Sequence, residues 1–303
     1  MEEFMTRDEL IKLAESARKN GAFQTISKDE LDSLPVKQNE QYIPATENGV
    51  HIFEFRPETP ANKKLPMLIN FHGGGFIKGR ADRDQVYCSH MADRIGALVW
   101  DVDYVLAPEH PFPAAVNECY DCIVYAFTHA DQLNVDTDKI LLLGHSAGSN
   151  LIAAACIKNA ESHAFRPAAM ILDYIPANQM TNPFCKLSPD QYGDERKMAR
   201  AKMEKLYLDF YMQPEEAVSP LASPILASEE VLGTFPDCLV ISAGHDSLME
   251  EGEAFAAKLA KSGVTVTSRR FRNSMHGFTI NRNGEWEEAL RLHETFINNH
   301  IGR

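Results

Sequence analysis

The chain has 303 residues with 30 basic and 43 acidic side chains, which gives a formal net charge of −13 at pH 7. With 44% hydrophobic and 24% charged residues, the composition is that of an ordinary globular protein with enough apolar residues for a sizeable core. The negative charge repels phosphate backbones, and no apolar run reaches the ~18 residues that span a bilayer, so we expect neither nucleic-acid binding nor membrane insertion.

The first residues and the cysteines indicate the cellular compartment. The start, Met1-Glu2-Glu3-Phe4, is charged and lacks the apolar stretch of a secretory signal. Six cysteines are too few for a disulfide scaffold, and their mostly apolar neighbours suit reduced, buried thiols. Cys119 and Cys122 form a C-x-x-C inside a predicted helix without further ligands at matching spacing, so we interpret them as structural. We therefore expect a cytoplasmic protein.

Two short helices are predicted in the first forty residues. The pattern Ser/Thr-x-x-Glu, in which a hydroxyl and a carboxylate satisfy free backbone donors at a helix start, begins at Thr6 and at Ser27. Gly21 is a plausible stop for the first helix. Because both helices precede any predicted strand, we assign residues 1–45 to a separate N-terminal cap.

From about residue 46 onward, predicted strands and helices alternate. The strand candidates are residues 50–55, 66–71, 97–103, 139–143, 168–174, 237–242 and 265–271. Several are nearly continuous apolar runs, which are typical of parallel strands covered by helices on both faces. The alternation predicts an α/β fold over residues 46–303, with a mostly parallel twisted sheet and flanking helices. Residues 177–225 contain no strand candidate, and we interpret them as a cap insertion that covers one edge of the sheet together with the N-terminal helices.

The strongest catalytic pattern is G-x-S-x-G, which reads Gly144-His145-Ser146-Ala147-Gly148. It directly follows a predicted strand and precedes a helical run, as a nucleophile elbow requires. On such a tight turn, glycines stand two positions before and two positions after the serine. A Cβ atom at either position would collide with neighbouring elements. Ser146 is therefore the predicted nucleophile, with an ordinary turn between strand and helix as the alternative.

Three consecutive glycines follow the strand at 66–71, in the run His72-Gly73-Gly74-Gly75-Phe76. Such a run costs chain entropy, but it lets backbone N–H groups approach a ligand without intervening side chains. We assign the amides of Gly73, Gly74 and Ala147 as donors to an oxyanion, and which of the glycines donate stays open. His72, Gly75, Gly144 and Gly148 are assigned supporting roles. A flexible hairpin or a phosphate-binding loop is the alternative, and no G-K-[ST] sequence follows to support a phosphate-binding loop.

A serine nucleophile needs a base, and the base needs an orienting carboxylate. In this architecture the three follow in the order serine, acid, histidine. Asp246, which begins a loop after the strand at 237–242, is the predicted acid, and Asp173 inside an apolar strand is the alternative. His276, in a loop beyond the final strand, is the predicted base. The other candidate bases are His245, next to the acid, and His293 and His300 on the C-terminal helix.

In these motifs the chain resembles the hormone-sensitive-lipase-like family of α/β-hydrolases, which are carboxylesterases. The matching segments are His72 to Phe76, Asp103 to Ala115, Gly144 to Gly148, Ala243 to Asp246 and His276 to Phe278. The resemblance implies hydrolysis of short-chain esters, acetyl to roughly hexanoyl, and a cap built from N-terminal helices and an insertion after the sixth strand. The chain departs from the family pattern at His145, Ser149 and Ser247, where the family usually has Asp, Gly and Pro. We interpret His145 as a packing or supporting residue.

Two other functions remain as alternatives. An amidase or formamidase would use the same triad, and a non-catalytic ligand-binding homologue would normally have lost a member of it. The expected partner is a small-molecule ester, and a homodimer stays an alternative to a monomer. No cofactor is expected, and no metal, because the 11 histidines include no H-E-x-x-H or comparable pattern.

Overall fold

The computed structural model describes residues 7–20, 23, 25–58, 63–186 and 194–303. In these residues eight strands form a single sheet, in the order β1-β2-β4-β3-β5-β6-β7-β8. The strands are β1 (Gln38–Ile43), β2 (Val50–Phe55), β3 (Leu65–Phe71), β4 (Leu98–Val102), β5 (Val135–His145), β6 (Ala169–Asp173), β7 (Asp237–His245) and β8 (Val266–Met275). The pairs β1–β2 and β2–β4 are antiparallel, and all other pairs are parallel.

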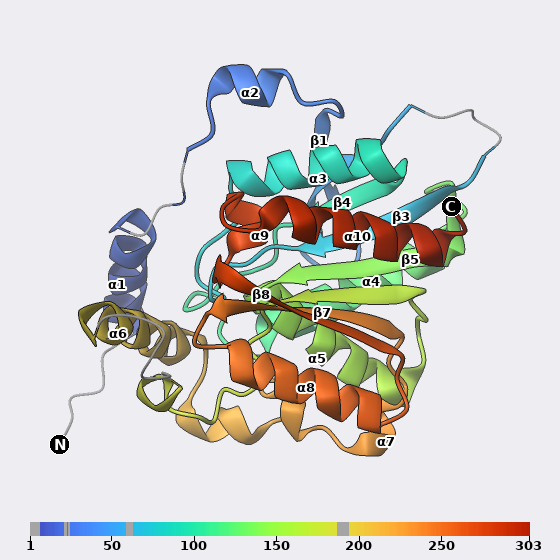
Figure 1. The fold of residues 1–303 in the computed structure, drawn as a ribbon. Coiled ribbons are helices and arrows are strands. Elements are labelled where there is room, and N and C mark those ends of the chain that lie inside the picture. Colours follow the sequence, from blue (N-terminus) through green and yellow to red (C-terminus); the bar gives the residue numbers. More distant parts are fainter. Residues whose placement is uncertain (1–6, 21–22, 24, 59–62, 187–193) are drawn as a thin grey trace.

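Helices cover both faces of this sheet (Figure 1). They are α1 (Arg7–Asn20), α2 (Lys28–Asp32), α3 (Asp82–Ile95), α4 (Ala114–Thr128), α5 (Ala147–Ser162), α6 (Asp194–Tyr211), α7 (Glu229–Leu232), α8 (Met249–Lys261), α9 (Phe278–Asn281) and α10 (Trp286–Ile301), with short 3-10 turns at Pro183–Cys185, Pro214–Val218 and Pro224–Leu226. One core cluster joins the sheet to α3 and α10, and a second joins its other face to α4, α5 and α8. This arrangement confirms the predicted α/β class.

The central strands are buried because their sequences are apolar on both faces. Every residue of β3, β4 and β6 is buried. The prediction for β2 has the observed bounds, whereas β5 and β8 extend beyond the predicted residues into polar sequence. β8 lies at the edge of the sheet and most of its side chains are exposed, so an apolar pattern marks only part of it.

Strand β1 was not predicted. It is the polar edge strand Gln38–Ile43, and its first three residues are exposed. It pairs with β2 in the register Ile43↔Val50. Residues 1–45, predicted to form a helical cap, therefore contain a strand of the main sheet as well as α1 and α2. Its Gln-Asn-Glu-Gln sequence lacks the alternation that marks a strand with one buried face, and pairing with β2 determines its conformation.

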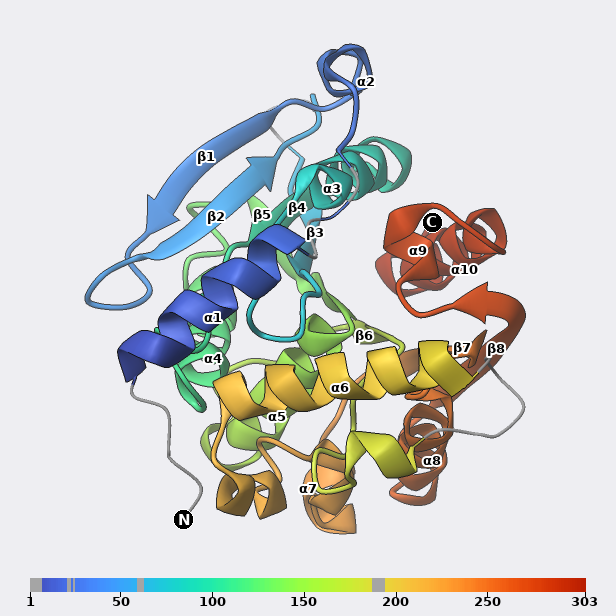
Figure 2. The same ribbon diagram turned by 90° about the vertical axis from the view of Figure 1, so that its left-hand side faces the viewer.

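The N-terminal helix and the insertion meet over one end of the sheet. In Figures 1 and 2, α1 and α6 lie near each other beyond the carboxyl ends of the parallel strands. Ser27 caps α2, since its hydroxyl accepts a hydrogen bond from the Glu30 amide at 3.2 Å. The predicted cap at Thr6 and the stop at Gly21 fall outside the described residues. Across the described part of the chain, none of the helices has the length and apolar character needed to cross a membrane.

Candidate active site

Ser146 stands between β5, which ends at His145, and α5, which begins at Ala147. Its φ of +53° and ψ of −116° place it in a strained conformation for a non-glycine residue. The neighbouring glycines make this turn feasible. A Cβ on Gly148 would lie 1.9 Å from the Phe71 carbonyl oxygen, and a Cβ on Gly144 would lie 2.4 Å from the Gly148 carbonyl carbon. The predicted elbow is thus a turn whose two glycines have no room for a side chain.

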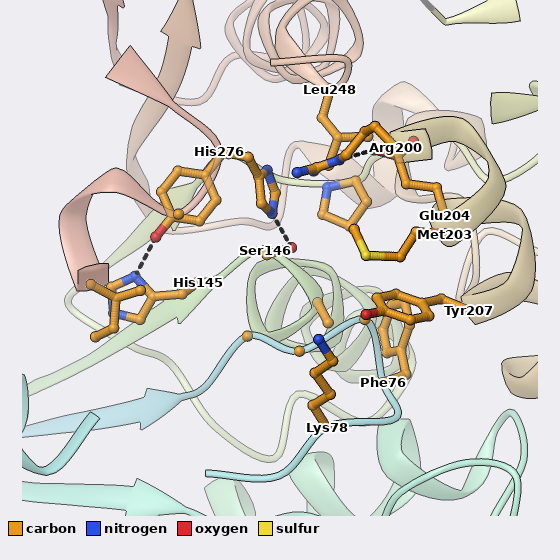
Figure 3. A pocket seen from close by; sticks show the side chains of 18 of the residues that line it. Phe76, Lys78, His145, Ser146, Arg200, Met203, Glu204, Tyr207, Leu248 and His276 are labelled. Atoms are coloured by element: carbon orange, nitrogen blue, oxygen red, sulfur yellow. Dashed lines mark hydrogen bonds and ion pairs between the residues drawn. The ribbon is translucent and has the colours of Figure 1, made fainter. Parts of the chain in front are cut away.

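Two loops at the carboxyl ends of neighbouring strands bring an imidazole and a carboxylate to this serine. Asp246 directly follows β7, and His276 directly follows β8. His276 Nε2 lies 2.9 Å from Ser146 Oγ, and His276 Nδ1 lies 2.7 Å from Asp246 Oδ2. Figure 3 shows the imidazole pointing at the serine hydroxyl. The structure therefore brings together three side chains that are far apart in the sequence.

Asp246 is only 2% exposed, so its charge depends on its partners. Burial raises the pKa of its carboxyl, but His276, the Arg200 guanidinium and the Leu248 amide outweigh burial and hold the pKa below its ordinary value. Asp246 is therefore an ionised hydrogen-bond acceptor for the imidazole. The ring of Tyr174 packs edge-on against His276, with centroids 4.8 Å apart, and restricts its orientation.

The glycine loop passes directly beside the serine. A Cβ on Gly73 would lie 2.9 Å from the His145 carbonyl oxygen and 3.4 Å from Ser146 Cβ. Gly74 has a φ of +148°, and a Cβ there would lie 2.4 Å from the Lys78 carbonyl oxygen. Gly73, Gly74 and Ala147 line the same cavity as Ser146 and His276. The three predicted amide donors and the side chains of Ser146 and His276 thus surround one space.

Contacts of the His72 side chain and carbonyl group fix the start of the glycine loop. It is fully buried, and its Nδ1 lies 3.0 Å from the Gly73 carbonyl oxygen. Its ring stacks on Tyr104 with centroids 4.3 Å apart, and the Tyr104 hydroxyl donates to the His72 carbonyl at 2.8 Å. These contacts hold the start of the loop in place.

The alternative acid, Asp173, belongs to a separate buried cluster. Its Oδ2 lies 3.0 Å from His145 Nδ1, its Oδ1 lies 3.0 Å from His293 Nε2, and Thr279 donates to it at 2.8 Å. Burial raises the pKa of Asp173, yet the two histidines more than offset burial and hold it well below its ordinary value. Since Asp173 is occupied by these partners, the geometry favours Asp246 as the partner of His276.

The remaining candidate histidines lie elsewhere. His300 Nδ1 is 2.8 Å from the Phe296 carbonyl oxygen on its own helix. His245 ends β7 and pairs in register with Met275. The link between His145 and His293 through Asp173 was missed from the sequence. The available signal was an aspartate inside an otherwise apolar strand, and nothing local indicates which side chains would satisfy it.

A cavity of about 410 Å³ lies over Ser146, and the cap forms its roof. Phe23, which follows α1, and residues of α6 line it: Arg200, Met203, Glu204, Tyr207 and Leu208. No cluster of metal-binding side chains occurs in the described residues. Cys119 and Cys122 are buried on α4, away from this lining.

Comparisons with known proteins agree with this architecture. A family model described as alpha/beta hydrolase fold matches residues 68–280. The chain is 30% identical over 267 residues to an AB hydrolase superfamily protein of Schizosaccharomyces pombe, covering 86% of this chain and 77% of that protein. It is 31% identical over 222 residues to an arylesterase of Saccharolobus solfataricus, covering 70% of this chain and 68% of that protein.

A solved esterase of Pyrobaculum calidifontis superposes on this structure with a TM-score of 0.83 at 29% identity, covering 99% of this chain and 96% of that chain. The family match spans the sheet from β3 to α9, and therefore includes the elbow, the glycine loop and the loops after β7 and β8. The chain belongs to the α/β-hydrolase fold family, and within it to the hormone-sensitive-lipase-like carboxylesterases.

Proposed function

We propose that this carboxylesterase hydrolyses small esters with short acyl chains, from acetyl to about hexanoyl, in two steps through an acyl-enzyme on Ser146. The observation that carries the proposal is the continuous series of contacts from Ser146 Oγ to His276 (2.9 Å) and from His276 to the buried Asp246 (2.7 Å). A serine hydroxyl becomes a useful nucleophile when such a base can accept its proton.

In the first step, Ser146 Oγ attacks the ester carbonyl carbon while His276 Nε2 takes the hydroxyl proton. Asp246 accepts the hydrogen bond from Nδ1–H and stabilises the imidazolium. The tetrahedral oxyanion accepts hydrogen bonds from two or three of the amides of Gly73, Gly74 and Ala147. The carbon–oxygen bond to the alcohol then breaks, and the alcohol leaves with the proton that His276 returns.

In the second step, water attacks the carbonyl carbon of the acyl-enzyme while His276 removes one of its protons. The same amides stabilise the second oxyanion. The bond between the acyl carbon and Ser146 Oγ breaks, and His276 returns the proton to that oxygen. The carboxylic acid leaves and the free enzyme is restored.

The size of the cavity supports a limit on acyl length. Its volume of about 410 Å³ lies near the lower end of the ~300–1,000 Å³ that is common for small-molecule sites. Met203 and Leu208 of the cap and Leu248 give it apolar walls, against which methylene groups pack.

A panel of p-nitrophenyl esters from acetyl to decanoyl tests the proposal. We expect kcat/KM to be highest for acyl chains of up to six carbons and to fall for longer ones. Aryl formamides and peptides in the same assay test the amidase alternative, and hydrolysis of these in preference to the esters would contradict the proposal.

An organophosphate label tests the nucleophile and the non-catalytic alternative together. We expect one equivalent of label on the wild type, none on Ser146→Ala, and one on the control Ser268→Ala, whose serine is exposed on β8. Absence of label on the wild type would favour a ligand-binding homologue.

A further inference from the structure

Asp173, at the end of β6, is a buried carboxylate that the proposed reaction does not use. Its backbone nevertheless contacts the nucleophile, because the Ser146 amide donates to the Asp173 carbonyl at 2.9 Å. Its side chain is fully buried, and an ionised carboxylate in such a place is costly unless several partners satisfy it. The partners of this carboxylate therefore show what it holds in place beside the active site.

A chain of hydrogen bonds runs from this carboxylate through α9. Thr279, three residues after His276, donates its hydroxyl proton to Asp173 Oδ2 at 2.8 Å. The Tyr174 hydroxyl oxygen lies 2.7 Å from Thr279 Oγ1. Because the threonine hydroxyl has a single proton and gives it to the carboxylate, the Tyr174 hydroxyl donates to Thr279. The two bonds therefore have one direction, from Tyr174 through Thr279 to Asp173.

Tyr174 connects this chain to the catalytic imidazole. Its ring packs edge-on against His276, with centroids 4.8 Å apart and ring planes at 61°. Its backbone amide donates to the Ile241 carbonyl of β7 at 2.7 Å, and its side chain is buried. Its φ of +39° is rare for a bulky residue, and such strain persists only where the surrounding structure holds it. The ring is therefore fixed both at its backbone and at its hydroxyl end.

His145 contacts the same carboxylate from the nucleophile elbow. Its Nδ1 lies 3.0 Å from Asp173 Oδ2 and 3.3 Å from the Tyr174 hydroxyl oxygen. An ionised carboxylate only accepts hydrogen bonds, so Nδ1 carries the proton. An aspartate at this position, which is usual in the family that the motifs resemble, would place a second negative charge beside Asp173. The departure from the family pattern at His145 thus fits a chain that ends on a carboxylate.

We propose that Tyr174 is a positioning residue, whose ring keeps the His276 imidazole aimed at the serine hydroxyl. Asp173 acts through it, because the hydrogen bonds by way of Thr279 fix the place of that ring. The imidazole is then held at two points, by Asp246 at Nδ1 and by the tyrosine ring at its side. No proton passes along the chain, which only orients the base. This inference rests on the proposed function and adds the residues that act through His276.

Substitutions along the chain supply the first test, with p-nitrophenyl butyrate as the substrate. Tyr174→Leu removes the ring, and we expect kcat to fall ~10-fold or more while KM stays within about threefold, since a misaligned base weakens the transition state. Tyr174→Phe keeps the ring and loses one hydrogen bond, so we expect a loss of about 2- to 10-fold. Thr279→Val breaks the same chain without contacting His276 and should match Tyr174→Phe. Thr279→Ser keeps the hydroxyl and should retain most of the activity.

A double-mutant cycle separates orientation of the base from a structural effect. In the His276→Ala background no imidazole remains to be oriented, so Tyr174→Leu should change the residual kcat by less than about twofold. The matched control is Tyr87→Phe, since Tyr87 is also buried, with its hydroxyl 2.9 Å from His293 Nδ1, but does not line the cavity. It removes the same hydroxyl group, and we expect it to lower the melting temperature and to leave kcat within about twofold of the wild type.

An unchanged kcat in Tyr174→Leu would overturn the inference, and so would a loss of the same size with and without His276. Equal losses in Tyr174→Phe and Tyr87→Phe would also overturn it, because general loosening of the buried cluster would then explain both. If Tyr174→Leu does not fold, the comparison of Tyr174→Phe with Tyr87→Phe decides. All these results leave the proposed function intact as long as the wild type hydrolyses esters and takes the organophosphate label. Failure of the wild type in both assays would instead contradict the proposed function.

Discussion

Tyr207 of the cap helix α6 lies directly against Gly75 of the glycine loop. A Cβ on Gly75 would lie 2.2 Å from Tyr207 Cδ2, and Gly75 has a φ of +62°. Nearby, Phe76 stacks on Tyr211 of the same helix with ring centroids 3.8 Å apart. The loop that presents backbone amides to the cavity and the helix that roofs the cavity are therefore packed as one unit, and a change at this contact is expected to alter both.

The first prediction concerns this contact. Gly75→Ala is expected to lower kcat/KM for p-nitrophenyl butyrate by at least ~10-fold, because the backbone strain of ~1–3 kcal/mol and the collision with Tyr207 displace the loop. The control is Gly263→Ala, at a φ of +92°, where an added Cβ would meet no atom within 4 Å beyond its chain neighbours. This variant is expected to lower stability without changing kcat/KM. Adding Tyr207→Ala to Gly75→Ala should recover part of the loss. Absence of any recovery would mean that backbone strain alone explains the defect.

The second prediction separates the two buried aspartates. Asp246→Asn is expected to lower kcat by about 10⁴-fold, because the imidazole loses its ionised partner, with a smaller loss of folding stability than Asp173→Asn, since the pKa of Asp173 is lowered further. Asp173→Asn is expected to lower the free energy of unfolding by ~3–5 kcal/mol, because it disrupts a buried cluster with His145 and His293. Steady-state kinetics and urea unfolding of both variants measure the contrast. The opposite pattern, with Asp173→Asn the more damaging to kcat, would contradict the assignment of Asp246.

The third prediction concerns the attachment of α1. Arg18 donates to both carboxylate oxygens of Glu109 at 2.7 Å, to the Ile77 carbonyl at 2.6 Å and to the Ala107 carbonyl at 2.8 Å. Lysine cannot reproduce this forked geometry. Arg18→Lys is expected to increase amide hydrogen exchange in α1 by several-fold, with little change in the strands of the sheet. Equal exchange in the variant and the wild type would show that apolar packing alone holds α1.

The same ion pair predicts a pH dependence. The hydrogen bond from Arg18 lowers the pKa of Glu109 below its ordinary value of 4.5. A lowered pKa means that the folded state favours the charged form, so the stabilisation is complete above that ordinary value and is lost as the pH falls through the lower folded value. Protection of α1 should decrease in that acidic range. Because both side chains are partly exposed, we expect an effect below about 1 kcal/mol. Glu109→Gln should abolish this dependence, and hydrogen exchange at several pH values measures it.

The fourth prediction compares two glycines inside helices, Gly148 in α5 and Gly252 in α8. Gly148→Ala is expected to abolish labelling of Ser146 and to destabilise the fold, because the new Cβ would lie 1.9 Å from a backbone oxygen of β3. Gly252→Ala in α8 has its nearest contact at 3.7 Å, to Ile175 Cγ2. It is expected to stabilise the protein by ~0.5–1 kcal/mol, since alanine restricts the unfolded chain. Thermal unfolding of both variants, with labelling, checks the contrast.

Sequence patterns predicted the local parts of the molecule well. Apolar runs identified the buried strands, because burial on both faces excludes polar side chains. The elbow around Ser146 was recognisable because strain at one residue requires glycines at fixed distances from it. The edge strand β1 was not predicted, because its exposed polar side chains show no hydrophobic periodicity. Its conformation depends on pairing with β2.

What only the tertiary structure decided is which distant groups meet. His276 and Ser146 are 130 positions apart, and the sequence left two aspartates as partners of the histidine. The sheet order places the ends of β7 and β8 side by side, so Asp246 meets His276, while Asp173 contacts His145 and His293 in a separate buried cluster. Local sequence patterns reflect how each segment hydrogen-bonds its own backbone groups and buries its own apolar side chains. The site depends instead on crossovers and packing that bring separate segments together.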